Sequence, residues 1–169
     1  MPSSFAHAAV AVIANPVLAK ADRRPAVIWI AACAAAAPDL DAIGWVIHGG
    51  SGGLPSAHRG VTHSLFVALA AAALATLVSR YRWPLASVAR TFGYFALVIA
   101  SHGLLDCLTS YGDGVELLAP FVRDRFTSPW QPFAGLGSEL LCLWLPAILF
   151  LYFNVGGFAK RPVARGWRR

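Results

Sequence analysis

The side chains of this sequence that are suited to chemistry are histidines and aspartates that interrupt strongly apolar segments. Imidazole and carboxylate groups are the protein ligands that hold Zn²⁺, Mn²⁺ or Mg²⁺. Ionisable groups at membrane depth are costly, which makes a functional role the first hypothesis for them. The candidate metal ligands are His7, Asp39, Asp41, His58, His63, His102 and Asp106. Their types and positions predict a site for a divalent metal ion.

His102 and Asp106 are four residues apart in an apolar segment. On an α-helix this spacing places two side chains on the same face, about one turn apart. The pair therefore suits two ligands of one ion, or one ligand and the carboxylate that orients it. A buried histidine–aspartate hydrogen bond that only holds helices together is the alternative for the pair taken alone.

His58 and His63 are five residues apart. On a single helix their side chains would point about 140° apart. They converge only if His58 lies in a loop and His63 lies in the first turn of the next helix. Gly60 would allow the bend between them, and Thr62 is a suitable N-cap residue for that helix.

Asp39 and Asp41 follow Pro38, which is expected to end the preceding helix by biasing Ala37 away from helical geometry. In an extended segment, residues two apart project to the same side. Two carboxylates placed in this way could bridge metal ions, or one could act as general base toward a bound water. A solvated, aspartate-rich turn is the alternative.

Arg59 lies between the two histidines and is the third catalytic candidate, beside Asp39 and Asp41. A guanidinium group binds phosphate or carboxylate through two parallel hydrogen bonds. Arg59 could therefore hold an anionic group of a substrate, and contact with a lipid headgroup is the alternative.

The composition indicates a membrane protein. The chain has 169 residues, of which 57% are hydrophobic and 13% are charged, and its mean hydropathy is +0.59. Soluble domains carry about 25% charged residues. A single domain over residues 1–169 is expected at this length. Cys33, Cys107 and Cys142 form no Cys-x-x-Cys motif, so neither a zinc ribbon nor a disulfide framework is indicated.

Five apolar segments are visible, at about residues 5–19, 25–37, 62–79, 88–108 and 138–155. The last three approach the ~20 residues with which an α-helix crosses a hydrocarbon core. The first two are shorter, and they either cross a locally thinned bilayer or form a hairpin packed against the others. The sequence thus predicts an all-α fold, a polytopic membrane bundle of about five apolar helices.

Positive charges gather on one side of such a bundle. With five crossings, all lysines and arginines except Arg59, Arg123 and Arg125 fall beside the turns at 20–24 and 80–90 or in the C-terminal tail. The positive-inside rule assigns that side to the cytoplasm. The basic tail at residues 160–169 is then expected to contact anionic lipid and not nucleic acid.

The acidic residues show the reverse bias, because all of them except Asp22 fall on the outer side. His7 falls on that side too, although an isolated histidine in a helix is more often a packing residue. The candidate ligands come from four helices and are expected to meet at the outer end of the bundle.

These motifs together resemble the YdjM family. The resemblance is carried by His7, Pro38-Asp39-Leu40-Asp41, His58-Arg59-Gly60-x-Thr62-His63-Ser64 and Ser101-His102-x-x-Leu105-Asp106-x-x-Thr109-x-Tyr111-Gly112. That family is described as LexA-regulated, membrane-bound metal-dependent hydrolases of the bacterial inner membrane. The resemblance implies metal ligands at all seven candidate positions, and it does not identify a substrate.

The expected function is hydrolysis by a metal-activated water, with a phosphoester of an amphiphilic or lipid molecule as the proposed substrate. One or two ions of Zn²⁺, Mn²⁺ or Mg²⁺ are expected, since seven candidate ligands exceed the needs of one tetrahedral ion. The site would face the periplasm, with the C-terminus in the cytoplasm. A divalent-metal transporter and a non-catalytic structural membrane protein are the alternatives, and the oligomeric state is left open.

Overall fold

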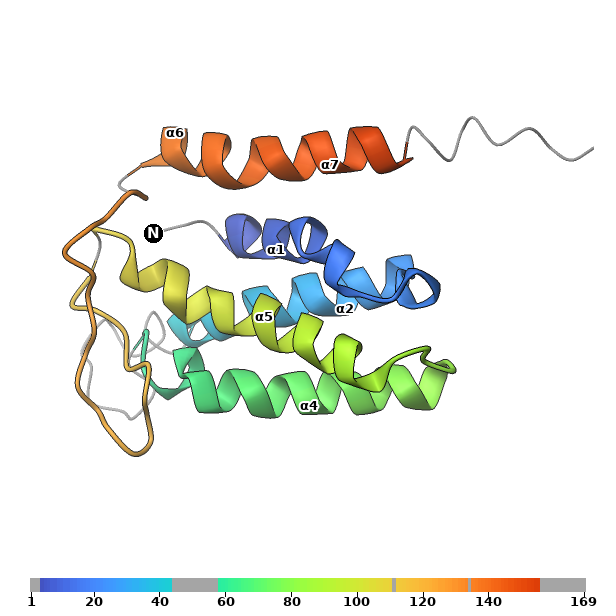
Figure 1. Ribbon diagram of the computed structural model, residues 1–169. Helices are drawn as coiled ribbons and strands as arrows, with labels where there is room; N and C mark the ends of the chain where they lie inside the picture. Colours follow the sequence, from blue (N-terminus) through green and yellow to red (C-terminus); the bar gives the residue numbers. More distant parts are fainter. Residues whose placement is uncertain (1–3, 44–57, 111, 134, 156–169) are drawn as a thin grey trace, which may run out of the picture.

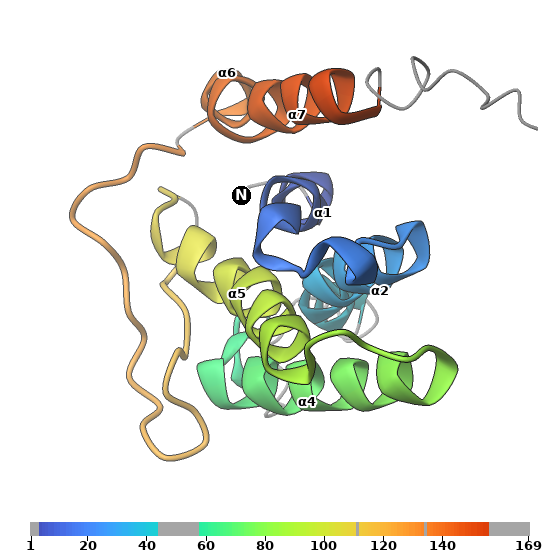
Figure 2. The same ribbon diagram turned by 45° about the vertical axis from the view of Figure 1, so that its right-hand side comes forward.

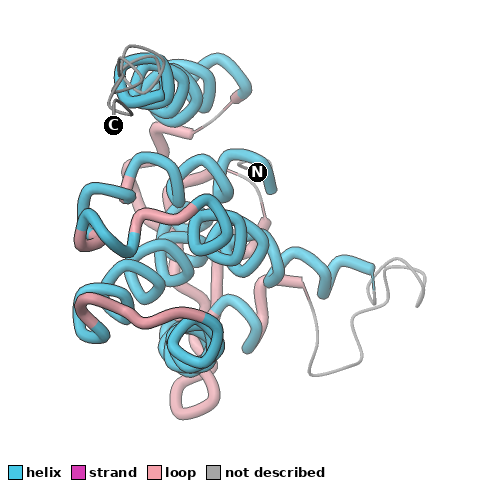
Figure 3. The backbone as a smooth tube through the Cα atoms, turned by 90° about the vertical axis from the view of Figure 1, so that its right-hand side faces the viewer, coloured by secondary structure: helices cyan, strands magenta, loops and turns pink. Residues whose placement is uncertain are grey.

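The computed structural model describes residues 4–43, 58–110, 112–133 and 135–155. Regular structure in these ranges is helical, apart from an isolated antiparallel bridge between Val115 and Phe126. The view along the helices shows helix and loop and no strand in the part described (Figure 3). The all-α class is therefore confirmed, while the basic tail at 160–169 lies outside the described residues.

Four helices form the body of the bundle, and a fifth helical run follows them. The helices are α1 (Ser4–Ile13), α2 (Pro25–Ala36), α4 (Leu65–Arg82), α5 (Val88–Cys107), α6 (Leu136–Glu139) and α7 (Leu145–Val155). The segments long and apolar enough to cross a membrane are Pro25–Ile43, Leu65–Arg82, Val88–Cys107 and Leu136–Phe153. The first helix belongs to a shorter apolar segment, Phe5–Val17.

Helix α5 packs against α1, α2 and α4, and α7 lies along α1 at the edge of the bundle (Figures 1 and 2). The core between these helices is rich in alanine, including Ala31, Ala35 and Ala72. Small side chains let helix backbones approach closely, which is how membrane helices pack. The Tyr94 hydroxyl donates a hydrogen bond of 2.7 Å to the carbonyl of Ala11 and so ties α5 to α1.

The bundle has two distinct ends (Figure 1). The turn end holds the short connections at 14–24 and 83–87. The loop end holds the segment at 58–64 and the long connection between α5 and α6.

Pro38 does not end the helical path of α2, contrary to our expectation. Ala37 keeps right-handed helical geometry, with φ −61° and ψ −34°, and a 3₁₀ turn runs over Ala37–Leu40. Proline is tolerated in the first turn of a helix, where its missing N–H is not needed. The chain therefore remains helical as far as Ile43, and Asp39 and Asp41 lie on helical turns and not on an extended segment.

Two further details of the helices differ from the sequence prediction. The N-cap of α4 is Ser64, whose hydroxyl accepts from the Val67 N–H at 3.2 Å, while Thr62 lies in the preceding 3₁₀ turn Val61–His63. The apolar segment at 138–155, predicted as a helix, contains a π-helical turn, Leu140–Trp144, just before Pro146. Because proline offers no N–H to the preceding turn, the helix changes its hydrogen-bonding pattern there.

Candidate metal centre

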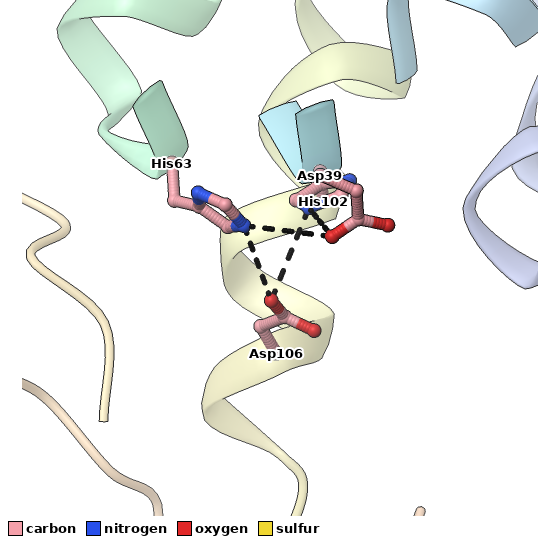
Figure 4. A group of neighbouring side chains, drawn as sticks. All are labelled: Asp39, His63, His102 and Asp106. Carbon is pink, nitrogen blue, oxygen red and sulfur yellow. Dashed lines mark ion pairs between the residues drawn. The ribbon is translucent and has the colours of Figure 1, made fainter. Parts of the chain in front are cut away.

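Four side chains from three helical segments converge at the loop end (Figure 4). Asp39 comes from the 3₁₀ turn after α2, His63 from the 3₁₀ turn before α4, and His102 and Asp106 from one face of α5. The last three are buried, and the Asp39 side chain is 11% exposed. One ligand atom from each residue lies within 4.8 Å of the others, so the group could hold a metal ion.

The spacing of these atoms suits a bound ion better than it suits hydrogen bonds. His63 Nε2 lies 3.8 Å from Asp39 Oδ1 and 3.5 Å from Asp106 Oδ2, while His102 Nε2 lies 3.4 Å and 3.9 Å from the same two oxygens. Hydrogen bonds from N–H to oxygen span about 2.7–3.2 Å. The two Nε2 atoms and the Asp106 carboxylate make none with the described residues. Two ligand atoms about 2.1 Å from a tetrahedral ion lie roughly 3.4 Å apart, so the residues present fit a divalent ion.

The tautomer of His102 is set by α2. Its Nδ1 lies 2.6 Å from the carbonyl oxygen of Ala35, which makes Nδ1–H the donor and leaves the lone pair of Nε2 facing the cluster. Ala35 lies in the last turn of α2, where carbonyls need partners from outside the helix. A metal-ligating histidine usually donates its other N–H to such an acceptor, which fixes the orientation of the ring.

Asp41 contacts two histidines and a threonine. Its Oδ1 accepts from His58 Nδ1 at 2.7 Å, and its Oδ2 accepts from the Thr62 hydroxyl at 2.6 Å and lies 3.3 Å from His63 Nδ1. A carboxylate in this position orients a ligating histidine and raises its basicity. Asp41, His58 and His63 also form a second group that could hold an ion, but both groups use the imidazole of His63.

His7 packs against the cluster from α1. Its ring stacks on that of His102, with centroids 3.8 Å apart and an interplanar angle of 27°. Its Nε2 lies 3.5 Å from Asp106 Oδ1, the carboxylate oxygen that is not paired with His63. Both ring nitrogens are buried, and neither makes a hydrogen bond with a described residue. His7 thus stands beside the four-residue group.

Arg59 is buried against the other side of Asp106. Its Nε lies 3.4 Å from Asp106 Oδ2, and its Nη2 donates to the Thr109 hydroxyl at 3.2 Å. Its backbone has φ 66°, a left-handed conformation that is uncommon outside glycine, and its carbonyl accepts the N–H of Glu116 at 3.1 Å. Gly112, itself at φ 77°, lies against the guanidinium, and a Cβ there would stand 3.1 Å from Nη1.

The pKa of His63 is raised by the neighbouring carboxylates Asp39 and Asp41. Burial lowers the pKa of His63, but Asp39 and Asp41 more than offset this and raise the pKa to about 9. In the metal-free protein the ring is therefore protonated at neutral pH. A metal ion that binds Nε2 has to displace this proton.

Comparison with known proteins identifies the family. The profile described as YdjM inner membrane protein matches residues 1–163. The chain is also 32% identical over 167 residues to the inner membrane protein YbcI of Escherichia coli (strain K12), with 89% of this chain and 95% of YbcI covered. The chain belongs to the YdjM family. Membership in the YdjM family and the four membrane-length helices support a multi-pass location in the inner membrane. No solved structure matches the chain.

The structure brings all seven predicted ligands of this YdjM-family chain together at the loop end. Four of them form the group in Figure 4, two more reach it through His63, and His7 stacks beside it. Asp39 and Asp41 enter different groups, because helical turns replace the extended segment that we expected. The roles of these residues as ligands stay predictions.

Sequence reasoning missed three groups that support the site. Thr62, predicted as an N-cap, donates to Asp41 instead, and Thr109 accepts from Arg59. Both lie in the motifs that carry the resemblance to the YdjM family, and that resemblance is the signal that could have found them. The third group, the Ala35 carbonyl, carries no side-chain signal in the sequence.

Proposed function

We propose that this protein is a metal-dependent hydrolase of the inner membrane, with a divalent ion held by Asp39, His63, His102 and Asp106. The observation that carries the proposal is the set of four facing ligand atoms, 3.4–3.9 Å apart along the four nitrogen–oxygen contacts. Two imidazole nitrogens with two carboxylate oxygens suit Zn²⁺ or Mn²⁺, whereas Mg²⁺ is usually bound through oxygen.

When bound, a divalent ion would supply a hydroxide nucleophile near neutral pH by lowering the pKa of a coordinated water, which requires a coordination position beyond those of the four side chains. Asp39 is the candidate general base, because its side chain is the most exposed of the four. Asp41 orients His58 and His63, since both of its oxygens are engaged.

The proposed substrate is a phosphoester, or a similar bond, in a small amphiphilic or lipid molecule. A site at one end of a membrane-spanning bundle lies near the depth of lipid headgroups, where such bonds are found. Arg59 adds a positive charge to that of the ion and favours an anionic substrate, while its guanidinium stays engaged by Asp106 and Thr109. Membrane lipids are then both the surroundings and the substrate class.

We also infer that the loop end faces the periplasm and the C-terminus faces the cytoplasm. The support is the positive charge at the turn end, where Arg23 and Arg90 donate to carbonyls of the turn at 14–24 and Lys20 and Arg82 lie nearby in the chain. Cytoplasmic loops carry the excess of lysine and arginine in inner-membrane proteins.

The test begins with elemental analysis of detergent-purified protein. Wild type is expected to hold stoichiometric metal, and His63→Ala and Asp106→Ala are expected to lose it. Arg125→Gln is the matched control, because Arg125 pairs with Glu116 in the α5–α6 connection and contacts no ligand of the group. Metal-loaded wild type should then release phosphate from lipid phosphoesters in mixed micelles, and the two ligand variants should not.

Other outcomes would contradict the hydrolase. Metal uptake into proteoliposomes without turnover would identify a divalent-metal transporter. A folded wild type that holds no metal after exposure to Zn²⁺, Mn²⁺ and Mg²⁺ would identify a structural protein whose polar cluster only joins its helices.

A further inference from the structure

The charges at the loop end balance for a single divalent ion. Asp39, Asp41 and Asp106 bring three negative charges on side chains that are at most 11% exposed. Within the described residues, Arg59 is the lysine or arginine that contacts these carboxylates. One divalent ion brings the formal sum to zero if the histidines are neutral, as ligation requires. A second ion would leave two positive charges uncompensated, and buried uncompensated charge is costly.

Asp106 is one of the two carboxylates, with Asp39, that a pair of ions in the four-residue group could share, because each faces both His63 Nε2 and His102 Nε2. Its Oδ2 faces His63 Nε2 at 3.5 Å and His102 Nε2 at 3.9 Å, and it also faces Arg59 Nε at 3.4 Å. In two-metal sites the ions stand about 3.5–4 Å apart and share ligands between them. Here the Arg59 guanidinium lies 3.4 Å from Asp106 Oδ2, an oxygen that such a pair of ions could share.

The second candidate group loses a ligand when the first is filled. A neutral imidazole carries one proton, so if His63 Nε2 binds an ion, Nδ1 holds the proton and donates to the Thr62 hydroxyl oxygen at 3.0 Å, with Asp41 Oδ2 3.3 Å away. His58 and Asp41 then remain, and they are already joined to each other at 2.7 Å. Asp41 and His58 therefore orient His63 for the first ion and do not bind a second ion.

Arg59 is held where it stands by its backbone as well as by its side chain. Its φ of 66° is one that residues other than glycine keep only when their surroundings fix it. The Glu116 N–H bonds to its carbonyl, Thr109 accepts from its Nη2, and the glycine at position 112 leaves room for the guanidinium. The positive charge of Arg59 is therefore permanent and held in one place, like the charge of a bound ion.

We propose that Arg59 is a fixed internal cation that takes the place of a second metal ion and limits the site to one divalent ion per chain. The proposal rests on the metal-binding part of the proposed function and concerns the number of ions. Arg59 acts through Asp106, whose charge it shares with the ion, and it is a positioning residue for that carboxylate.

The experiment counts ions in full-length, detergent-purified protein that is stripped with chelator and reloaded with Mn²⁺. Elemental analysis gives Mn²⁺ per chain, and electron paramagnetic resonance distinguishes isolated Mn²⁺ from a spin-coupled pair. Wild type is expected to hold one isolated ion. Arg59→Gln is expected to hold two coupled ions, because the place beside Asp106 is freed and the charge deficit grows.

Two variants serve as controls. Arg59→Lys keeps the positive charge and is expected to hold one ion. Arg125→Gln removes an arginine elsewhere at the loop end and is also expected to hold one ion.

Two ions in wild type, or one ion in a folded Arg59→Gln protein, would overturn the inference and leave metal binding intact. An absence of ions in wild type would overturn the metal-dependent function as well, so the two failures are distinguishable. Should Arg59→Gln fail to fold, the wild-type count and spectrum decide the proposal alone.

Discussion

Two buried aspartates stand at opposite ends of this bundle, and their surroundings differ. At the turn end, Asp22 accepts the N–H of Ala86 at 2.8 Å on one oxygen and the N–H of Ser87 at 3.0 Å on the other. At the loop end, Asp106 is just as buried, but its oxygens lie 3.4–3.9 Å from the side-chain nitrogens of His7, Arg59, His63 and His102 and make no hydrogen bond with the described residues. A buried carboxylate is costly unless it is hydrogen-bonded or paired. The first is satisfied within the chain, and the second is suited to an added cation.

The difference shows that burial alone does not mark a functional acid. Asp22 ties the turn at 14–24 to the turn at 83–87 and so joins α1 and α2 to α5. Its position as the exceptional acid at the positively charged turn end has a structural reason. What separates Asp106 from Asp22 is the distance and type of the partner atoms.

The largest effect is expected when the same aspartate-to-asparagine substitution is made at each end of the bundle. Asp106→Asn should weaken metal binding by more than about 100-fold, because the loss of a ligand exceeds the 10–100-fold typical of an outer partner. Asp22→Asn should leave the metal content unchanged and lower the free energy of unfolding by about 1.5–3 kcal/mol, since charged hydrogen bonds to two amides are lost. Elemental analysis and thermal unfolding in detergent measure the two effects.

The result that would refute this contrast is an exchange of the two phenotypes. If Asp22→Asn lost metal while remaining folded, or if Asp106→Asn kept it, the partner distances would not distinguish a structural carboxylate from a ligand.

The second prediction sharpens the comparison by testing a carboxylate that supports the site without belonging to the four-residue group. Asp41→Asn should weaken metal binding by about 10–100-fold, because the negative charge that lies 3.3 Å from His63 Nδ1 is lost. The same change lowers the pKa of His63, which eases metal binding at neutral pH. The measurement is therefore a chelator-buffered Mn²⁺ titration at pH 9, where protons compete only weakly with Mn²⁺ for His63. An unchanged dissociation constant there would assign no supporting role to Asp41.

The helices of this molecule could be predicted from the sequence, because apolar segments of membrane length are a strong signal. The fourth segment, predicted at 88–108, is α5 at Val88–Cys107. The helical turns around Pro38 could not be predicted, since proline is compatible both with the end of a helix and with the first turn of a 3₁₀ segment. That ambiguity led to the wrong geometry for Asp39 and Asp41.

The gathering of histidines and aspartates at one end could also be predicted, because the charge bias fixed the order of the helix ends. The division of these residues into a group that faces the ion position and a supporting group could not be predicted from the sequence. This division depends on which nitrogen of His63 faces which carboxylate. It also depends on the backbone carbonyl of Ala35, whose contact with His102 cannot be read from residue types. The burial of Arg59 against Asp106 likewise depends on a left-handed backbone conformation that its residue type does not suggest.

The third prediction tests how close the backbone must come at the loop end, using two glycines of α5. A Cβ at Gly103 would overlap the carbonyl oxygen of His63, so the 3₁₀ turn that carries this ligand must move. Gly103→Ala should lower the free energy of unfolding by about 1–3 kcal/mol and weaken metal binding about tenfold.

Gly93→Ala is the matched control on the same helix. No atom lies within 4 Å of a Cβ built there, so the change should stabilise α5 by about 0.5–1 kcal/mol and leave metal binding unchanged. Equal effects of the two substitutions on metal affinity would show that close packing of α5 against His63 does not position the ligand.

The fourth prediction concerns the proton that His63 holds in the metal-free protein. Because Asp39 and Asp41 raise the pKa of His63 to about 9, the ring holds its proton throughout the neutral range. The affinity for Mn²⁺ should therefore rise by up to about tenfold per pH unit between pH 6 and 8 and level off above pH 9. Calorimetry at pH 7 in two buffers of different ionisation enthalpy should report about one proton released per ion bound.

A flat affinity between pH 6 and 8, with no proton released, would mean that His63 enters the complex already neutral. The expected result would instead give the comparison a chemical basis. The partners of Asp22 are the backbone amides of Ala86 and Ser87, which an added ion cannot replace. The loop-end carboxylates face a protonated His63 whose proton an ion could replace, and this exchange would make one end of the bundle a binding site while the other stays a structural joint.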